Sequence, residues 1–170
     1  LKVSKSTLRR DLLELEHLGH VVRVRGGVMH RDQVRGEPNF EARRARRVEQ
    51  KQAIADAATQ LVESHHAVYL DAGTTCFEIG QRLIRQPGLR LFTHSIRLVA
   101  RAIDAEASLT CVGGEFRPSS EALTGGLTLA WLEKLRFNIA FVAASGIDAN
   151  GATTTEISEA TIKQEILQRA

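Results

Sequence analysis

The chain has 170 residues, of which 43% are hydrophobic and 25% charged, which is the composition of a globular protein rather than a disordered or fibrous one. No apolar run of about 18 residues occurs, and the start of the chain resembles neither a signal peptide nor an import sequence. Cys76 and Cys111 form neither a disulfide framework nor a metal-ligand pattern. We therefore expect a cytoplasmic protein with reduced thiols, no metal site, no cofactor and no membrane partner.

The charge is distributed unevenly along the chain. Residues 1–35 carry eight Lys and Arg against four Asp and Glu, a net charge of +4, whereas residues 36–170 carry 15 against 16, a net charge of −1. A basic segment on a near-neutral body is typical of a nucleic-acid reader attached to a domain with another task. Charge alone fits a solvated helix face equally well.

Residues 4–18 predict an amphipathic helix. Leucines recur three and four positions apart, a serine near the start can cap the helix, and Gly19 follows the last periodic residue. A recognition helix inserts its N-terminal end into the major groove, and here the polar face is most basic in its first two turns. The residues that we expect at DNA from this helix are Ser4, Ser6, Thr7, Arg9 and Arg10.

Residues 20–28 predict two short strands of alternating Val and Arg that end at a Gly-Gly turn. A basic ribbon beside a basic helix indicates a winged helix-turn-helix, with Arg23 and Arg25 on backbone phosphates. The leucine face needs two preceding helices to cover it, and the chain begins at what would be the turn. We therefore expect residues 1–30 to be a truncated DNA-binding domain.

Residues 31–46 have little periodicity and contain Gly36 and Pro38, so they predict a linker. Residues 40–63 are first charged and then apolar, which predicts a helix that packs on a second domain. The arginines early in this helix fit a solvated face better than contacts with DNA.

From residue 67 onward, short apolar strands alternate with loops of Gly, Ser, Thr and Asp and with helices. The expected strands are 67–70, 89–92, 108–112 and 139–143, and the expected helices include 76–84 and 96–103. This alternation predicts a parallel sheet covered on both faces, an α/β domain. Ligands of such sheets bind along the rim where the strands end.

The loop at residues 71–75 is the best candidate on that rim for binding an anion. Gly73 allows close approach of the backbone, while Thr74 and Thr75 offer hydroxyl and N–H groups at a helix N-terminus. A phosphate would suit this loop. A capped strand-to-helix turn needs similar residues, so the loop alone is weak evidence for a ligand.

The last predicted helix carries Glu159 and Lys163 four residues apart, which is also the spacing of an ordinary surface ion pair. Trp131 and Phe137 flank another helix, and we expect both in the core. The six histidines show no metal-ligand spacing with cysteines or acids.

Motifs along most of the chain resemble one known family. The string Val3-Ser4-x-x-Thr7-Leu8-Arg9-Arg10-Asp11-Leu12, followed by Gly19 and by Arg23-Val24-x-Gly26-Gly27, resembles the DNA-binding signature of DeoR-type bacterial transcriptional regulators. Five further motifs are similar, in order, to the sensor domain of that family. They are Asp71-Ala72-Gly73-Thr74-Thr75, Thr93-x-Ser95, Gly113-Gly114-x-x-Arg117, Phe141-x-x-x-x-Gly146-Ile147-Asp148 and Thr153-Thr154-x-x-x-x-Glu159-x-x-x-Lys163.

The resemblance implies a sensor domain over residues 47–170 with a fold like that of ribose-5-phosphate isomerase and glucosamine-6-phosphate deaminase. It also implies a homo-oligomeric repressor of a carbohydrate-utilisation operon, bound to operator DNA and released by a phosphorylated sugar. The effector-binding residues that it implies are Asp71, Gly73, Thr74, Thr75, Thr93, Ser95, Gly113, Arg117, Gly146, Glu159 and Lys163. Arg117 and Lys163 would supply the positive charge.

Two departures from the family pattern stand out. His94 lies where the family usually has Asn, so we expect altered contacts with the ligand. The family's sensor domain continues beyond the motifs present here, so we expect a chain truncated at both ends.

Two alternatives remain open at this point. One is an enzyme that isomerises or deaminates a sugar phosphate, with Asp71, Glu159 or Lys163 as its general base. The helix and wing motifs argue against it, because such an enzyme has no use for them. The other is a non-functional remnant of a repressor gene.

Overall fold

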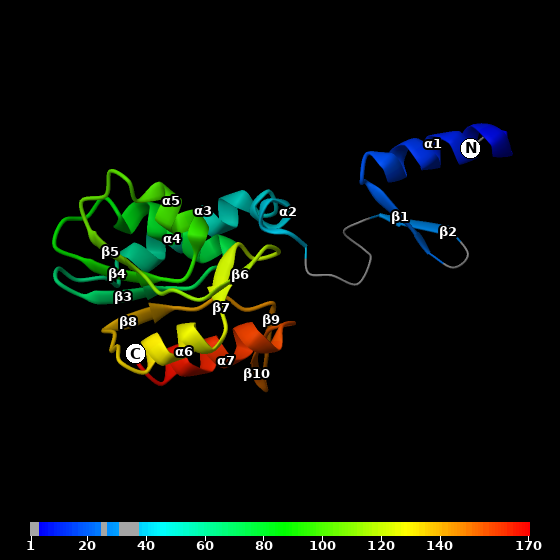
Figure 1. Ribbon diagram of the computed structural model, residues 1–170. Coiled ribbons are helices and arrows are strands. Elements are labelled where there is room, and N and C mark those ends of the chain that lie inside the picture. Colours follow the sequence, from blue (N-terminus) through cyan, green and yellow to red (C-terminus); the bar gives the residue numbers. More distant parts are fainter. Residues whose placement is uncertain (1–3, 25–26, 31–37) are drawn as a thin grey trace. The chain divides into compact units, whose positions relative to one another are not determined.

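The computed structural model describes residues 4–24, 27–30 and 38–170, and the chain divides into two compact units, Leu1–Pro38 and Asn39–Ala170 (Figure 1). The first unit contains helix α1 (Lys5–His17) and an antiparallel ribbon of strands β1 (Val21–Val24) and β2 (Gly27–His30). Ser4 caps α1 by accepting the Thr7 N–H at 3.1 Å, and Gly19 follows the helix with a φ of 74°. The predicted helix and ribbon are both present, although Gly27 opens the second strand.

The second unit contains the remaining elements. Its helices are α2 (Phe40–Arg44), α3 (Val48–Thr59), α4 (Thr74–Leu83), α5 (Ile96–Arg101), α6 (Gly126–Leu132) and α7 (Ile157–Leu167). The strands are β3 (Ala67–Leu70), β4 (Arg90–Thr93), β5 (Ser108–Cys111), β6 (Glu115–Arg117), β7 (Ala122–Thr124), β8 (Ile139–Phe141), β9 (Gly146–Asp148) and β10 (Gly151–Thr153).

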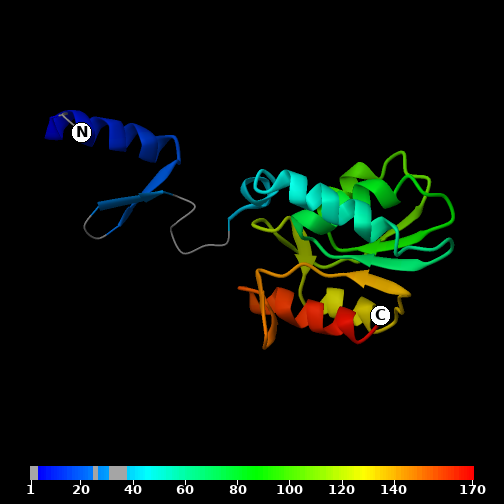
Figure 2. The same cartoon turned by 180° about the vertical axis from the view of Figure 1, so that it is seen from behind.

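Four of these strands form a parallel sheet in the order β5-β4-β3-β8, while β6 with β7 and β9 with β10 form antiparallel pairs. Helices α3, α4 and α5 lie on one face of the sheet, and α6 and α7 lie on the other (Figures 1 and 2). The structure thus confirms the predicted α/β class and the parallel sheet with helices on both faces.

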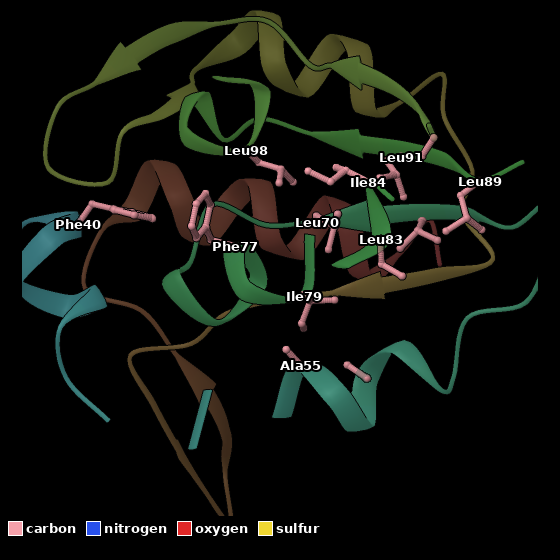
Figure 3. Close-up of a cluster of buried hydrophobic side chains, with 13 residues drawn as sticks. Phe40, Ala55, Leu70, Phe77, Ile79, Leu83, Ile84, Leu89, Leu91 and Leu98 are labelled. Atoms are coloured by element: carbon pink, nitrogen blue, oxygen red, sulfur yellow. The ribbon is translucent and has the colours of Figure 1, made fainter. Parts of the chain in front are cut away.

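Each face of the sheet has its own hydrophobic core, because successive side chains of a strand point to opposite faces. In β3, Val68 and Leu70 join the core beneath α3, α4 and α5, whereas Tyr69 joins the core beneath α6 and α7. Figure 3 shows the first core, where Phe40 of α2 meets Phe77 of α4 edge to face, with ring centroids 5.7 Å apart.

Residues 40–63 form two helices rather than the single helix that the sequence predicted. The break falls at Ala45–Arg47, where Arg47 has a left-handed backbone with a φ of 51°. Lys51 stabilises the break, since its ammonium donates to the carbonyls of Arg43 and Arg46 at 2.5 and 2.6 Å. The expected linker, residues 31–46, overlaps α2, whose Phe40 is fully buried, while residues 31–37 lie outside the described part.

The expectation that Trp131 lies in the core was wrong. Trp131 is on α6 with 55% of its surface exposed, and the Lys134 ammonium lies 5.5 Å from the centre of its ring. Its neighbour Leu132 points into the core, and one residue along a helix turns the next side chain by about 100°. Phe137, predicted alongside it, is buried.

In the part of the chain that the structure describes, no helix is both long enough and apolar enough to cross a membrane.

Candidate functional site

The carboxyl ends of β3, β4 and β8 meet at one rim of the parallel sheet. Asp71 directly follows β3, His94 follows β4, and Ala143 lies two residues beyond β8. The register pairs Leu70 with Thr93, so the next residues, Asp71 and His94, lie beside each other. Both side chains are almost completely buried.

The Asp71 carboxylate lies against four nitrogen atoms. Its two oxygens accept the backbone N–H groups of Ala72 and Ala143, each at 2.8 Å. The Lys163 ammonium lies 3.2 Å from Oδ2, and the imidazole Nε2 of His94 lies 3.3 Å from Oδ1. These four donors hold the carboxylate in one orientation and compensate for its removal from water.

Lys163 connects this carboxylate to Glu159 one turn earlier on α7, with Nζ 3.4 Å from Glu159 Oε2. The pair predicted from the i, i+4 spacing is thus a buried bridge rather than a surface pair. Burial alone lowers the pKa of the Lys163 ammonium, but the Asp71 and Glu159 carboxylates outweigh burial and leave that pKa above its ordinary value. Lys163 is therefore charged at neutral pH.

Arg117, at the end of β6, holds the other side of Glu159, with Nη1 2.8 Å from Oε1. The same guanidinium contacts the Ser120 hydroxyl at 3.1 Å and the Glu156 carboxylate at 3.5 Å. Burial raises the pKa of Glu159, but Lys163, the hydrogen bond with Ser120 and Arg117 outweigh it and hold the pKa below its ordinary value. Four predicted residues, Asp71, Lys163, Glu159 and Arg117, therefore form one continuous ionic network.

Thr93 and Ser95 lie at the same rim, but their hydroxyls serve the local fold. The Thr93 hydroxyl donates to the Leu70 carbonyl at 2.7 Å and accepts the Ser95 N–H at 3.0 Å. The Ser95 hydroxyl caps α5 by accepting the Leu98 N–H at 3.3 Å. Both side chains are buried, and a direct contact with an effector stays a prediction.

The loop after Asp71 leads directly into α4, whose N-cap residue is Gly73 and which has no side-chain cap. A Cβ on Gly73 would lie 2.2 Å from the Cβ of Ala143, so the close approach of two rim loops requires glycine here. Thr74 and Thr75 supply the first N–H groups of the helix, where the helix dipole favours an anion.

The remaining two predicted effector residues have different surroundings. Gly113 follows β5, its carbonyl accepts the Thr128 hydroxyl at 2.9 Å, and nothing lies within 4 Å of a Cβ built on it. Gly146 opens β9 in an exposed antiparallel pair. Both residues stay candidates for effector contacts.

In the first unit, three of the predicted DNA-contact residues gather at the start of α1. The Ser4 hydroxyl lies 2.7 Å from that of Ser6 and 2.8 Å from that of Thr7. Arg9 and Arg10 are exposed on the same helix. Arg23 on β1 forms an ion pair with Glu16 of α1, with Nε 2.9 Å from Oε2, and Arg25 lies outside the described residues.

The site also contains residues that sequence reasoning did not place there. His94 was noted only as a departure from the family pattern, yet its imidazole Nδ1 lies 2.5 Å from the Tyr69 hydroxyl. Ser120 and Glu156 also contact Arg117. The contact between Tyr69 and His94 could have been suspected from the sequence, because Tyr69 lies within an otherwise aliphatic strand. Nothing in the sequence marked Ser120.

Comparisons with known proteins agree with this organisation. A family profile described as the DeoR C terminal sensor domain matches residues 46–170, and one described as the DeoR-like helix-turn-helix domain matches residues 1–34. The lactose phosphotransferase system repressor of Streptococcus mutans is 32% identical over 100% of this chain and 69% of its own length.

Two further relatives are transcriptional regulators. The uncharacterized HTH-type transcriptional regulator FruR of Bacillus subtilis is 31% identical over 98% of this chain and 67% of its own length. The HTH-type transcriptional regulator GlpR of Haloferax volcanii is 30% identical over 100% of this chain and 67% of its own length. The chain thus spans about two thirds of the length of these relatives.

A basic helix-and-ribbon unit joined to an α/β unit with a charged rim defines a DNA-binding regulator with a sensor domain. The two matched profiles together cover nearly the whole chain. The chain belongs to the DeoR family of transcriptional regulators.

Proposed function

We propose that this chain acts within a homo-oligomeric repressor of a carbohydrate-utilisation operon, released from operator DNA by a phosphorylated sugar. The observation that carries the effector proposal is the ionic network of Asp71, Lys163, Glu159 and Arg117 beside the uncapped N-terminus of α4. Among the relatives, one is named as a repressor of the lactose phosphotransferase system and another as a putative aga operon transcriptional repressor.

The chemistry of this rim favours a small polar ligand with an anionic group. The N–H groups at the start of α4 and the Lys163 ammonium suit a phosphate, which accepts hydrogen bonds from both. The Glu159 carboxylate can accept hydrogen bonds from sugar hydroxyls. The open space beside Gly113 gives a ring room to approach the backbone.

A regulatory role also fits the state of Asp71 better than an enzymatic one. A general base must offer a lone pair to the proton that it removes. The Asp71 carboxylate already accepts hydrogen bonds from Ala72, Ala143 and Lys163, and the His94 imidazole lies 3.3 Å away. We therefore propose that the chain is not an enzyme, and turnover of a sugar phosphate by the purified protein would contradict this.

The effector proposal is tested by thermal unfolding with a panel of sugar phosphates, each matched by its unphosphorylated sugar. A ligand at about 100 times its dissociation constant stabilises the folded state by about 2.7 kcal/mol, which gives a readily measured shift. We expect a phosphorylated sugar to raise the midpoint and its free sugar to leave it unchanged. Lys163→Met should remove the shift. Equal shifts with both sugars would reject the anion site.

The repressor proposal is tested by fluorescence anisotropy with DNA from the promoter adjacent to the gene. The sugar phosphate that stabilises the protein should weaken DNA binding by about 5- to 150-fold, the usual range of allosteric coupling. A protein that binds neither the sugar phosphates nor this DNA would fit the remnant alternative instead.

A further inference from the structure

We propose that Tyr69 and His94 are positioning residues of the effector site, forming a buried hydrogen-bond relay that holds the Asp71 carboxylate against Lys163. The inference rests on the proposed function and deepens it, because it states how the cation that faces the effector is fixed. It also gives a role to His94, whose position the sequence marked as unusual.

Tyr69 lies on β3, Asp71 and His94 directly follow β3 and β4, and all three side chains are almost completely buried. The Tyr69 hydroxyl lies 2.5 Å from Nδ1 of His94, and Nε2 of the same ring lies 3.3 Å from Oδ1 of Asp71. The centroids of the tyrosine and histidine rings lie 5.9 Å apart, and the ring planes differ by 24°. Contacts at both ring nitrogens orient the imidazole.

The direction of the relay follows from the protonation states of its members. Burial and the nearby Lys163 lower the pKa of His94, against the opposing effect of Asp71 and Glu159, so the imidazole is neutral at pH 7. A neutral imidazole has one N–H donor and one acceptor nitrogen. Because an ionised carboxylate can only accept, Nε2 must donate to Asp71, and Nδ1 must accept from the Tyr69 hydroxyl. Burial and the charge of Asp71 raise the pKa of Tyr69, so the phenol keeps its proton.

The relay changes the role of Asp71. With donors from Ala72, Ala143, His94 and Lys163, both carboxylate oxygens are occupied, so Asp71 serves to hold Lys163 rather than to contact the effector. Lys163 Nζ lies 3.2 and 3.5 Å from the two Asp71 oxygens and 3.4 Å from Glu159 Oε2. An ammonium has three N–H donors, so one can turn to an anion when each carboxylate takes one, and its direction depends on how firmly Asp71 is held.

The test combines NMR spectroscopy with a titration of inorganic phosphate, a probe that carries the anionic group without a sugar. Long-range ¹H–¹⁵N correlation spectra of the wild-type chain report which nitrogen of His94 carries the proton. Phosphate affinity is then measured for wild type, His94→Gln, His94→Leu and Tyr69→Phe. Gln places an N–H donor close to the position of Nε2, whereas Leu keeps the volume and has no donor.

We expect the Nε2–H tautomer of a neutral ring, a phosphate affinity about tenfold weaker in His94→Leu, and substantial rescue in His94→Gln. Tyr69→Phe should lie between wild type and His94→Leu, because it removes only the outer hydrogen bond. If the two residues had a purely structural role, the variants would unfold at a lower midpoint, but His94→Gln and His94→Leu would bind phosphate with the same affinity.

Three results would overturn the proposal. An Nδ1–H tautomer or a charged His94 ring would contradict the proposed direction of the hydrogen bonds. This measurement uses only the wild-type chain, so it does not depend on the folding of a variant. Equal phosphate affinity in wild type and His94→Leu would reject the positioning role while the proposed function stands. A wild-type chain that does not bind phosphate would reject the anion site itself, and the relay as part of it.

Discussion

Gly73 and Gly113 both follow strands at the rim, but only Gly73 is confined by its surroundings. A Cβ on Gly73 would lie 2.2 Å from the Cβ of Ala143, which belongs to a loop fixed by its N–H bond to Asp71. Gly73→Ala should therefore lower the free energy of unfolding by about 1–3 kcal/mol, the usual effect of overpacking. Gly113→Ala is the matched control, since nothing lies within 4 Å of its added Cβ, and it should change stability by less than about 0.5 kcal/mol. Urea unfolding of both variants measures this, and equal losses would contradict the prediction.

His94 gives the stability a specific pH dependence. Its pKa is lowered in the folded state by burial, with Tyr69, Asp71, Glu159 and Lys163 facing the ring, so protons bind preferentially to the unfolded chain. His94 therefore does not reduce the free energy of unfolding above the ordinary histidine pKa of about 6.5. As the pH falls from this value toward the lower pKa of His94 in the folded state, the free energy of unfolding decreases by about 1.4 kcal/mol per pH unit.

His94→Gln lacks this titration, so the difference in stability between wild type and variant should shift in favour of the variant as the pH falls from 7.5 to 5. Urea unfolding across this range gives the difference directly. Glu159 does not disturb the window, because its lowered pKa costs stability only as the pH falls below the ordinary glutamate value of about 4.3. A constant difference across the range would show that burial of His94 does not exclude its proton.

At the scale of single residues, the sequence predicted the charged residues of the site but not their burial or their contacts. Arg117, Glu159 and Lys163 were predicted because the motifs that contain them resemble those of the DeoR sensor domain. The contact between Tyr69 and His94 was not predicted, since the two residues are 25 positions apart in the sequence and meet only through the register of two strands and their burial. Spacing alone could not distinguish a buried bridge at Lys163 from a surface pair.

Helix α2 is a short element whose end depends on one lysine. The Lys51 ammonium of α3 donates to the carbonyls of Arg43, Arg44 and Arg46, at 2.5, 3.2 and 2.6 Å. The backbone leaves the helix at this point, so these carbonyls depend on donors from outside α2; the Arg46 N–H, 3.3 Å from the Arg43 carbonyl, is one, and Lys51 supplies the others. Lys51→Met should therefore lower the stability by about 1–3 kcal/mol, as expected for hydrogen bonds from a charged donor.

The loss should be concentrated in α2, where hydrogen exchange of the backbone amides should accelerate. Lys134→Met provides a matched control at an exposed lysine whose main contact is the ring of Trp131, a contact worth about 0.5–1 kcal/mol. Equal protection of the α2 amides in wild type and Lys51→Met would show that the core contact of Phe40 holds the helix without the lysine.

The predictability of the elements follows their burial. The four strands of the parallel sheet were predicted with starts correct to within one residue, because each is a short apolar run bounded by small polar residues. The pairs β6–β7 and β9–β10 were not predicted, since these short strands, three of them mostly exposed, do not stand out as apolar runs. Contacts distant in sequence fix their positions, as in the N–H of Leu123 donating to the carbonyl of His94 at 2.8 Å.

For the whole molecule, the helix-turn-helix profile over residues 1–34 and the basic charge of this segment together point to DNA binding by the first unit. Residues 1–35 carry a net charge of +4, and residues 36–170 carry −1. A substitution that removes one cation from a DNA phosphate should reduce the slope of log affinity against log salt concentration by about 0.9. Arg9→Ala and Arg10→Ala should each produce this change with duplex DNA of any sequence if the side chains contact only phosphates. Arg101→Ala, at an exposed position of α5 in the second unit, should leave the slope unchanged.

Arg23 extends this prediction to a residue whose charge is shared within the unit. Its guanidinium lies 2.9 Å from Glu16, so binding a phosphate requires this exposed ion pair to open or to share its donors. Glu16→Gln removes the competing carboxylate and should strengthen binding to duplex DNA, while Arg23→Ala should weaken it and lower the salt slope by about 0.9. When Arg23 is already replaced by Ala, Glu16→Gln should strengthen DNA binding less, because Glu16 no longer competes with a phosphate for the Arg23 guanidinium. Anisotropy titrations at several KCl concentrations measure all four proteins. An undiminished gain from Glu16→Gln without Arg23 would show that the carboxylate acts only through general repulsion of DNA.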